Sequence, residues 1–212
     1  MTPQELRRWI EGRLDPIESF DPTARAGGSD FDLNPGSRPQ PDGRPLAPAA
    51  VLVPLVEHED GVTVLLTRRA DTLRSHTGQV ALPGGRCDPG EQPWDTALRE
   101  AHEEIGLEPG YVTIAGLSSA YQTGTGFDIT PVVGFVRPGF TLVPNPAEVA
   151  DIFEAPFAFL MNPDNHERRA MKASDGALRH FYAMPYQERL IWGATAGMLR
   201  ALYERLFGTA AA

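Results

Sequence analysis

The sequence contains a single cysteine, Cys87, and this scarcity excludes two kinds of stabilisation. One thiol can form neither an internal disulfide nor a thiolate metal cluster, which suits a reducing compartment. No run of 18 apolar residues occurs, so no segment is expected to span a membrane. The N-terminal stretch MTPQELRRWIEGRL carries acids and lacks the apolar core of a secretory signal. The sequence therefore predicts a cytoplasmic protein.

Basic residues are also few: 19 lysines and arginines stand against 28 aspartates and glutamates, for a net charge of -9. General binders of nucleic acid or of anionic membranes need a basic surface, so the balance argues against both partners while allowing a local basic pocket. A length of 212 residues with 42% hydrophobic residues suits one domain with a sizeable core. The sequence leaves the oligomeric state open, a homodimer included.

Short periodic segments follow one another along the chain and predict an α/β protein. A capping box at Thr2-Pro3-Gln4-Glu5 opens a helix to about Leu14, and residues 15–48, rich in Pro, Gly, Asp and Arg, are expected to form an extended arm. Strand patterns cover 49–58, 61–69, 78–85, 111–121 and 127–136, followed by short helical or loop pieces at 147–153 and 156–161, a hairpin around Asp175-Gly176, and a closing helix over 187–207. We expect an N-terminal helix and arm over 1–45 and a domain over 46–212, with helices on both faces of its sheet.

The segment after the third strand pattern combines helical periodicity with an unfavourable charge pattern. Glu100, Glu103 and Glu104 fall within an arc of roughly 100° in the last turns before Gly106, a typical helix stop. Each like-charged pair costs about 0.2–0.5 kcal/mol, and the helix dipole opposes anions at this end. A cation is therefore expected nearby. Clustered carboxylates suit Mg²⁺ or Mn²⁺, and the alternative is a solvated charged face.

The glycine loop and this helix have a distinctive spacing. Gly85 is followed after five residues by Glu91, and after seven more by Arg99-Glu100-Ala101-His102-Glu103-Glu104-Ile105-Gly106. This spacing resembles the Nudix box, the signature loop and helix of the Nudix hydrolase family. The resemblance implies a Nudix-type α/β/α sandwich with a mixed β-sheet and a hydrolase dependent on Mg²⁺ or Mn²⁺. It further implies metal ligands at Gly85, Glu100, Glu103 and Glu104, and a bracing role for Glu91 and Arg99.

The residues before the box add a narrower resemblance, to the Nudix enzymes that cleave coenzyme A. The matching positions are Leu66, Thr67, Arg69, Ala70, Arg74, Gly78, Pro83, Gly84 and Gly85. The departure is Leu82, where that subgroup usually has Phe. The resemblance implies hydrolysis of the diphosphate of coenzyme A or its acyl derivatives, giving 3′,5′-ADP and 4′-phosphopantetheine or its acyl form.

A substrate with three phosphate groups needs cations from this acidic chain. Just before the box lie Arg68, Arg69 and Arg74. A guanidinium group can donate two parallel hydrogen bonds to two oxygens of one phosphate group. His76 is a further candidate donor, with a structural role as its alternative, and Arg68 has a surface ion pair as its alternative.

A further acid, Glu148, lies where Nudix enzymes often carry one that completes the metal site or acts as base. Its alternative is an ordinary acid in the first turn of a helix. Glu103, Glu104 and Glu148 are all candidates for the general base, and the sequence does not choose among them. The alternative activities are hydrolysis of another nucleoside diphosphate, such as ADP-ribose or NADH, and non-catalytic nucleotide binding, whose usual mark would be a broken box.

Overall fold

The computed structural model describes residues 2–23, 27–37, 45–70, 78–173 and 176–208. The predicted substrate residues Arg74 and His76 lie outside these ranges. Among the described helices, none combines the length and the apolar character needed to cross a bilayer.

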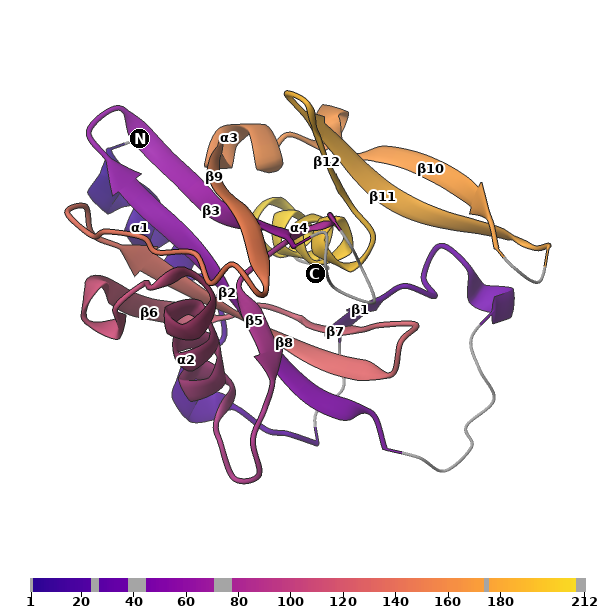
Figure 1. The fold of residues 1–212 in the computed structure, drawn as a ribbon, viewed down its shortest axis with the longest axis horizontal. Coiled ribbons are helices and arrows are strands. Elements are labelled where there is room, and N and C mark those ends of the chain that lie inside the picture. The colour runs from indigo at the N-terminus through magenta and orange to yellow at the C-terminus, as the bar shows by residue number, and fades with distance from the viewer. Residues whose placement is uncertain (1, 24–26, 38–44, 71–77, 174–175, 209–212) are drawn as a thin grey trace.

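The described strands form one large mixed sheet and one small antiparallel sheet (Figure 1). In the large sheet, β2 pairs in parallel with β8 and antiparallel with β3, so strand directions are mixed. The order of hydrogen-bonded strands is β1-β7-β8-β2-β3-β4, and in addition β5 pairs with β2, β6 with β8 and β9 with β3. The bounds are β1 Gly27–Ser29, β2 Ala47–His58, β3 Gly61–Arg69, β4 Val80–Ala81, β5 Gly84–Arg86, β6 Val112–Leu117, β7 Ala120–Gln122, β8 Phe127–Val136 and β9 Val149–Pro156. The small sheet contains β10 Glu167–Lys172, β11 Leu178–Tyr186 and β12 Arg189–Trp192.

Strand β2 is apolar along most of its length because both of its faces are covered. Ala50 and Leu52 belong to the hydrophobic core under α2, whereas Val51 and Val53 belong to the core on the opposite face. Successive side chains of a strand point to opposite faces, so a continuous apolar run is what a central strand between two layers requires.

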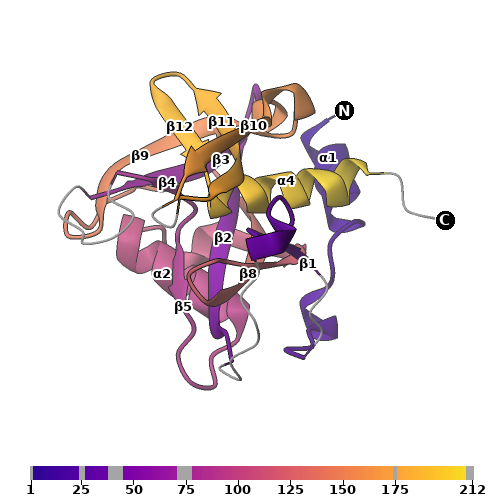
Figure 2. The same ribbon diagram turned by 90° about the vertical axis from the view of Figure 1, so that its right-hand side faces the viewer.

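Helices cover the large sheet on both faces (Figure 2). Helix α2 (Pro93–Ile105) lies on one face, and α4 (Ala194–Phe207) with α1 (Pro3–Glu11) on the other. The remaining helices are short: α3 Phe157–Leu160, and the 3₁₀ turns η1 Ile17–Ser19, η2 Pro35–Ser37, η3 Pro109–Tyr111 and η4 Pro163–Asn165. This arrangement is an α/β/α sandwich with a mixed sheet, as the sequence predicted.

The ends of α1 and α2 follow from local chemistry. In α1 the capping box between Thr2 and Glu5 is formed in both directions, but the helix ends at Glu11, earlier than predicted, because Gly12 caps it. In α2 the predicted stop is confirmed: Gly106 adopts φ 69°, a left-handed conformation that glycine tolerates best.

Three predicted elements were wrong. Residues 147–153 were expected as helix or loop, but β9 begins at Val149 and pairs with β3. The closing helix was expected from residue 187, but β12 precedes it, and Gly193 at φ 65° separates strand from helix. The arm was expected to be extended without strands, but β1 joins the edge of the large sheet beside β7. A Cβ on Gly27 would lie 1.8 Å from the carbonyl oxygen of Ala120, so this close pairing requires glycine.

Candidate functional site

The glycine loop lies against the acidic helix. Strand β5 carries Gly84 and Gly85, pairs with the start of β2 and leads through the loop into α2. A Cβ added to Gly85 would lie 2.4 Å from Glu100 Oε1, so the missing side chain leaves the space that this carboxylate fills. The loop backbone and the first acid of the cluster are therefore in contact.

Glu104 is the buried member of the acidic cluster, with 5% of its surface exposed. Its carboxylate accepts a hydrogen bond of 3.2 Å from the Gly84 amide. Burial is the main cause that raises the pKa of Glu104 to about 7, and the negative charges of Glu148 and Glu100 contribute to the rise. The hydrogen bond from Gly84 and the positive charge of Arg69 act in the opposite direction and lower this pKa. Three carboxylates and one arginine therefore lie within electrostatic reach of one another.

Arg99 is a cation in direct contact with the acidic cluster. Its guanidinium donates to both oxygens of Glu91, at 2.9 and 3.0 Å, and to Glu100 Oε1 at 2.8 Å. It also contacts Glu103 at 3.2 Å and the Arg86 carbonyl at 3.3 Å. The Arg99 hydrogen bonds lower the pKa of Glu91 to about 2, and Thr96, at 2.6 Å, adds to the effect. One arginine thus joins the loop to the last turns of α2.

Glu148 lies at the end of a turn that precedes a strand, so the alternative of a first-turn helix acid is wrong. Its carbonyl accepts a hydrogen bond of 2.8 Å from the Ala70 amide, after the end of β3. Asn145 contacts Glu148 Oε1 through its side-chain amide at 3.3 Å and donates its backbone amide to the Glu104 carbonyl at 2.8 Å. Asn145 therefore connects the distal acid to the acidic helix.

The predicted arginines differ in their surroundings. Arg69 ends β3, and its Nε is buried without a hydrogen-bond partner among the described residues. Its charge lowers the pKa of Glu104, so it lies near the cluster. Arg68 precedes it and already has an interaction partner.

The carboxylates of the acidic cluster are suitable ligands for a divalent cation, although their side chains are not arranged around a common metal position. Oxygen donors are the ligands that Mg²⁺ and Mn²⁺ prefer, and a buried carboxylate beside two others gains from a shared cation. Within the described part of the chain, however, no three His, Cys, Asp or Glu side chains converge as a metal site. Glu100 and Glu103 instead contact Arg99. Metal binding through them would require both carboxylates to turn from that guanidinium.

The structure contains two pockets of comparable size, and one of them borders the loop. One, of about 710 Å³, lies beside the loop and is lined by Arg86, Cys87, Glu91 and the arm residues Phe20 and Pro22, among others. The other, of about 570 Å³, lies between the arm, the small sheet and α4, and no residue of the box lines it.

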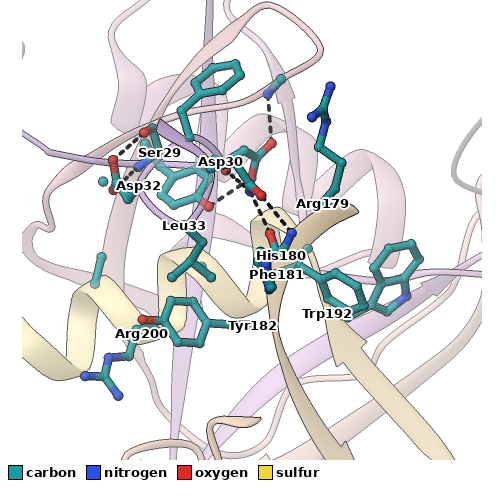
Figure 3. A pocket seen from close by; sticks show the side chains of 18 of the residues that line it. Ser29, Asp30, Asp32, Leu33, Arg179, His180, Phe181, Tyr182, Trp192 and Arg200 are labelled. Atoms are coloured by element: carbon teal, nitrogen blue, oxygen red, sulfur yellow. Dashed lines mark hydrogen bonds between the residues drawn. The ribbon is translucent and has the colours of Figure 1, made fainter. Parts of the chain in front are cut away.

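Polar side chains that line the 570 Å³ pocket form hydrogen bonds between the N-terminal arm and the two sheets (Figure 3). Asp30 accepts hydrogen bonds from the Tyr121 hydroxyl at 2.9 Å and the Gly124 amide at 2.7 Å. Asn34 donates to the His180 carbonyl at 2.8 Å and accepts from its amide at 2.7 Å. These bonds attach the arm to both sheets.

Sequence reasoning missed two members of the site, Asn145 and Arg86. The Asn-Pro pair at 145–146 is a turn signal, and the Ala147 amide donates to Asn145 Oδ1 at 3.1 Å, as such turns do. The sequence could have located this turn, but not the two acids that it connects. Arg86 occupies a variable position of the box and carries no sequence signal of its own.

A family model and two curated relatives identify the family of this chain. A family model described as the NUDIX domain matches residues 46–176. The uncharacterized Nudix hydrolase NudL of Photorhabdus laumondii is 40% identical over 159 residues, covering 74% of this chain and 84% of the relative. The protein of the same name in Yersinia pestis is 37% identical over 159 residues, and the match covers 74% of this chain and 79% of that relative. Among solved structures, a MutT/nudix family protein from Enterococcus faecalis has a TM-score of 0.49 at 14% identity, covering 96% of this chain and 73% of that one.

The range matched by the family model contains the strands, the loop and the acidic helix that form the site. Nudix hydrolases generally use divalent metal ions such as Mg²⁺ or Mn²⁺, which suits the oxygen-rich cluster around Glu104. The chain belongs to the Nudix family and is a Nudix hydrolase, an enzyme of the diphosphatase type.

Proposed function

We propose that this hydrolase cleaves the diphosphate of coenzyme A or its acyl derivatives, releasing 3′,5′-ADP and 4′-phosphopantetheine or its acyl form. The proposal rests on the motif from Leu66 to Gly85, and one structural observation supports it. Arg69, a motif residue, keeps a buried Nε without a partner among the described residues and lies near the Glu104 cluster. A phosphate oxygen at this point would satisfy that donor.

In this proposal, Glu100, Glu103 and Glu104 hold the metal together with the carbonyl of Gly85. Bound there, Mg²⁺ or Mn²⁺ supplies charge to the diphosphate and lowers the pKa of a water. Glu103, Glu104 and Glu148 remain candidates for the base.

The other residues bind and position. Arg69, with Arg68, Arg74 and His76, donates to phosphate oxygens. Glu91 and Arg99 brace the loop against α2 through their paired hydrogen bonds.

A substrate panel tests the assignment. Coenzyme A, acetyl-coenzyme A, ADP-ribose and NADH are incubated with the enzyme and either Mg²⁺ or Mn²⁺, and the products are identified by mass spectrometry. Coenzyme A or its acyl form is expected to have the largest kcat/KM and to yield 3′,5′-ADP. If ADP-ribose or NADH were cleaved far faster, the substrate assignment would be wrong. If no compound were cleaved, a binding role would replace catalysis.

Divalent metal is expected to raise the melting temperature, because it binds the acids only where the fold brings them together. At a metal concentration of about 100 times Kd, the stabilisation is about 2.7 kcal/mol, or about 5–10 °C for a chain of this size. Differential scanning fluorimetry with and without Mg²⁺ measures it. Glu100→Gln should reduce the gain, whereas Glu108→Gln, beyond the end of α2, should leave it unchanged. An equal gain in both variants would place the metal elsewhere.

A further inference from the structure

Nearly every described arginine is used within the fold. Arg7 pairs with Glu57, Arg189 with Asp151 and Arg205 with Asp15, and others donate to carbonyl oxygens or stack on aromatic rings. Within the described part of the chain, only Arg69, Arg86 and Arg168 have a guanidinium without a hydrogen bond, ion pair or ring contact. Arg69 lies near Glu104, Arg86 directly follows Gly85 in the glycine loop, and Arg168 lies in the exposed strand β10.

Arg86 is held at the loop by its backbone while its side chain is exposed. Arg86 directly follows Gly85 and lies opposite Ala49 in the antiparallel pairing of β5 with β2. Its backbone carbonyl accepts a hydrogen bond of 3.3 Å from the Arg99 side chain. The glutamates of the box do not require it, because Arg99 already pairs with Glu91, Glu100 and Glu103. Its positive charge is therefore available to a ligand.

The space beside Arg86 can hold part of a ligand. It lines the pocket of about 710 Å³ and is the one basic residue among the described residues that do so. The acids Asp21, Asp88 and Asp128 also line this pocket and repel anions. Among the described residues that line the pocket, Arg86 is therefore the one that attracts a phosphate group.

We propose that Arg86 recognises the phosphate monoester on the ribose of the substrate and thereby sets specificity. This inference rests on the proposed function. The reacting diphosphate would be met by the metal and by Arg69 with the other basic residues before the box, so the phosphate group on the ribose requires a further cation outside the carboxylate cluster. Arg86 is the described cation closest in sequence to the loop that meets this requirement, and it acts in binding, outside the chemical step.

Arg86→Gln tests the proposal, with Arg168→Gln as a matched control. Both changes remove one positive charge from an exposed arginine without a partner among the described residues, and only the first lies beside the loop. The measured quantity is the ratio of kcat/KM for coenzyme A to kcat/KM for 3′-dephospho-coenzyme A, at saturating Mg²⁺. Arg86→Gln is expected to lower this ratio about tenfold, the loss of one charge-assisted hydrogen bond at an exposed site. Arg168→Gln should keep it within about twofold, and Arg86→Lys should restore part of it.

An unchanged ratio in Arg86→Gln, or an equal fall in Arg168→Gln, would overturn the proposal. A binding measurement separates this failure from failure of the proposed function. Calorimetric titration of 3′,5′-ADP and of 5′-AMP should show that Arg86→Gln weakens the first about tenfold more than the second. A wild-type enzyme that does not cleave coenzyme A would refute the substrate assignment, and the titration would still decide whether Arg86 recognises a ribose phosphate.

Discussion

Replacing Glu104 with Gln is expected to stabilise the metal-free protein by about 3 kcal/mol at pH 8 while lowering its turnover by orders of magnitude. Burial raises the pKa of this carboxyl from 4.5 to about 7, and each unit corresponds to about 1.4 kcal/mol. Because the folded pKa lies above the unfolded value, the ionised group destabilises the fold increasingly from about pH 4.5 to pH 7, and fully above pH 7. Gln keeps an oxygen that can accept from the Gly84 amide and carries no charge.

The measurement is urea unfolding of both proteins in EDTA at pH 5 and pH 8. The gain should be small at pH 5, where Glu104 is largely protonated, and near its full size at pH 8. Glu103→Gln is the matched control, because that side chain is 55% exposed and its change should leave the free energy of unfolding nearly unaltered. Turnover should fall in both variants. A Glu104→Gln protein that is less stable than wild type at pH 8 would show that the acid supports the fold.

Much of the framework was predictable because it depends on local signals. The apolar stripe of α2 and its stop at Gly106 define that helix without tertiary information. The hairpin between β2 and β3 follows from two apolar runs joined by a short turn. The Nudix spacing likewise placed the loop and the acids on adjacent elements.

The elements that sequence reasoning missed depend on partners distant in the chain. Residues 149–156 form a strand because β3 offers them an edge to pair with. Arg99 was expected as a brace, but its contacts with Glu100 and Glu103 are seen only in the folded chain. The same holds for Asn145, which reaches both Glu104 and Glu148. Such polar connections depend on distances that residue spacing along the chain does not supply.

Glu91→Gln is expected to have the opposite effect to Glu104→Gln: a loss of about 1–3 kcal/mol in stability, with most of the turnover kept in the folded protein. Glu91 accepts two hydrogen bonds from Arg99 and one from Thr96, and its side chain is 16% exposed. Hydrogen bonds to charged groups contribute about 1.5–3 kcal/mol, and solvent at the loop reduces this. Urea unfolding at pH 7 and single-substrate kinetics on the same preparation measure both effects.

The pH dependence of this loss identifies its cause. The pKa of Glu91 is lowered to about 2, so its contribution to stability is complete above about pH 4.5 and disappears as the pH falls through 2. The difference between wild type and Glu91→Gln should therefore shrink from pH 5 to pH 2. Glu108→Gln, at an exposed pair with His102, should show no such difference. If Glu91→Gln kept its stability and lost turnover, Glu91 would act on metal or substrate. A stability loss with turnover retained would instead assign the Glu91–Arg99 pair to holding the loop against α2, leaving the chemistry to the acids of the helix's last turns.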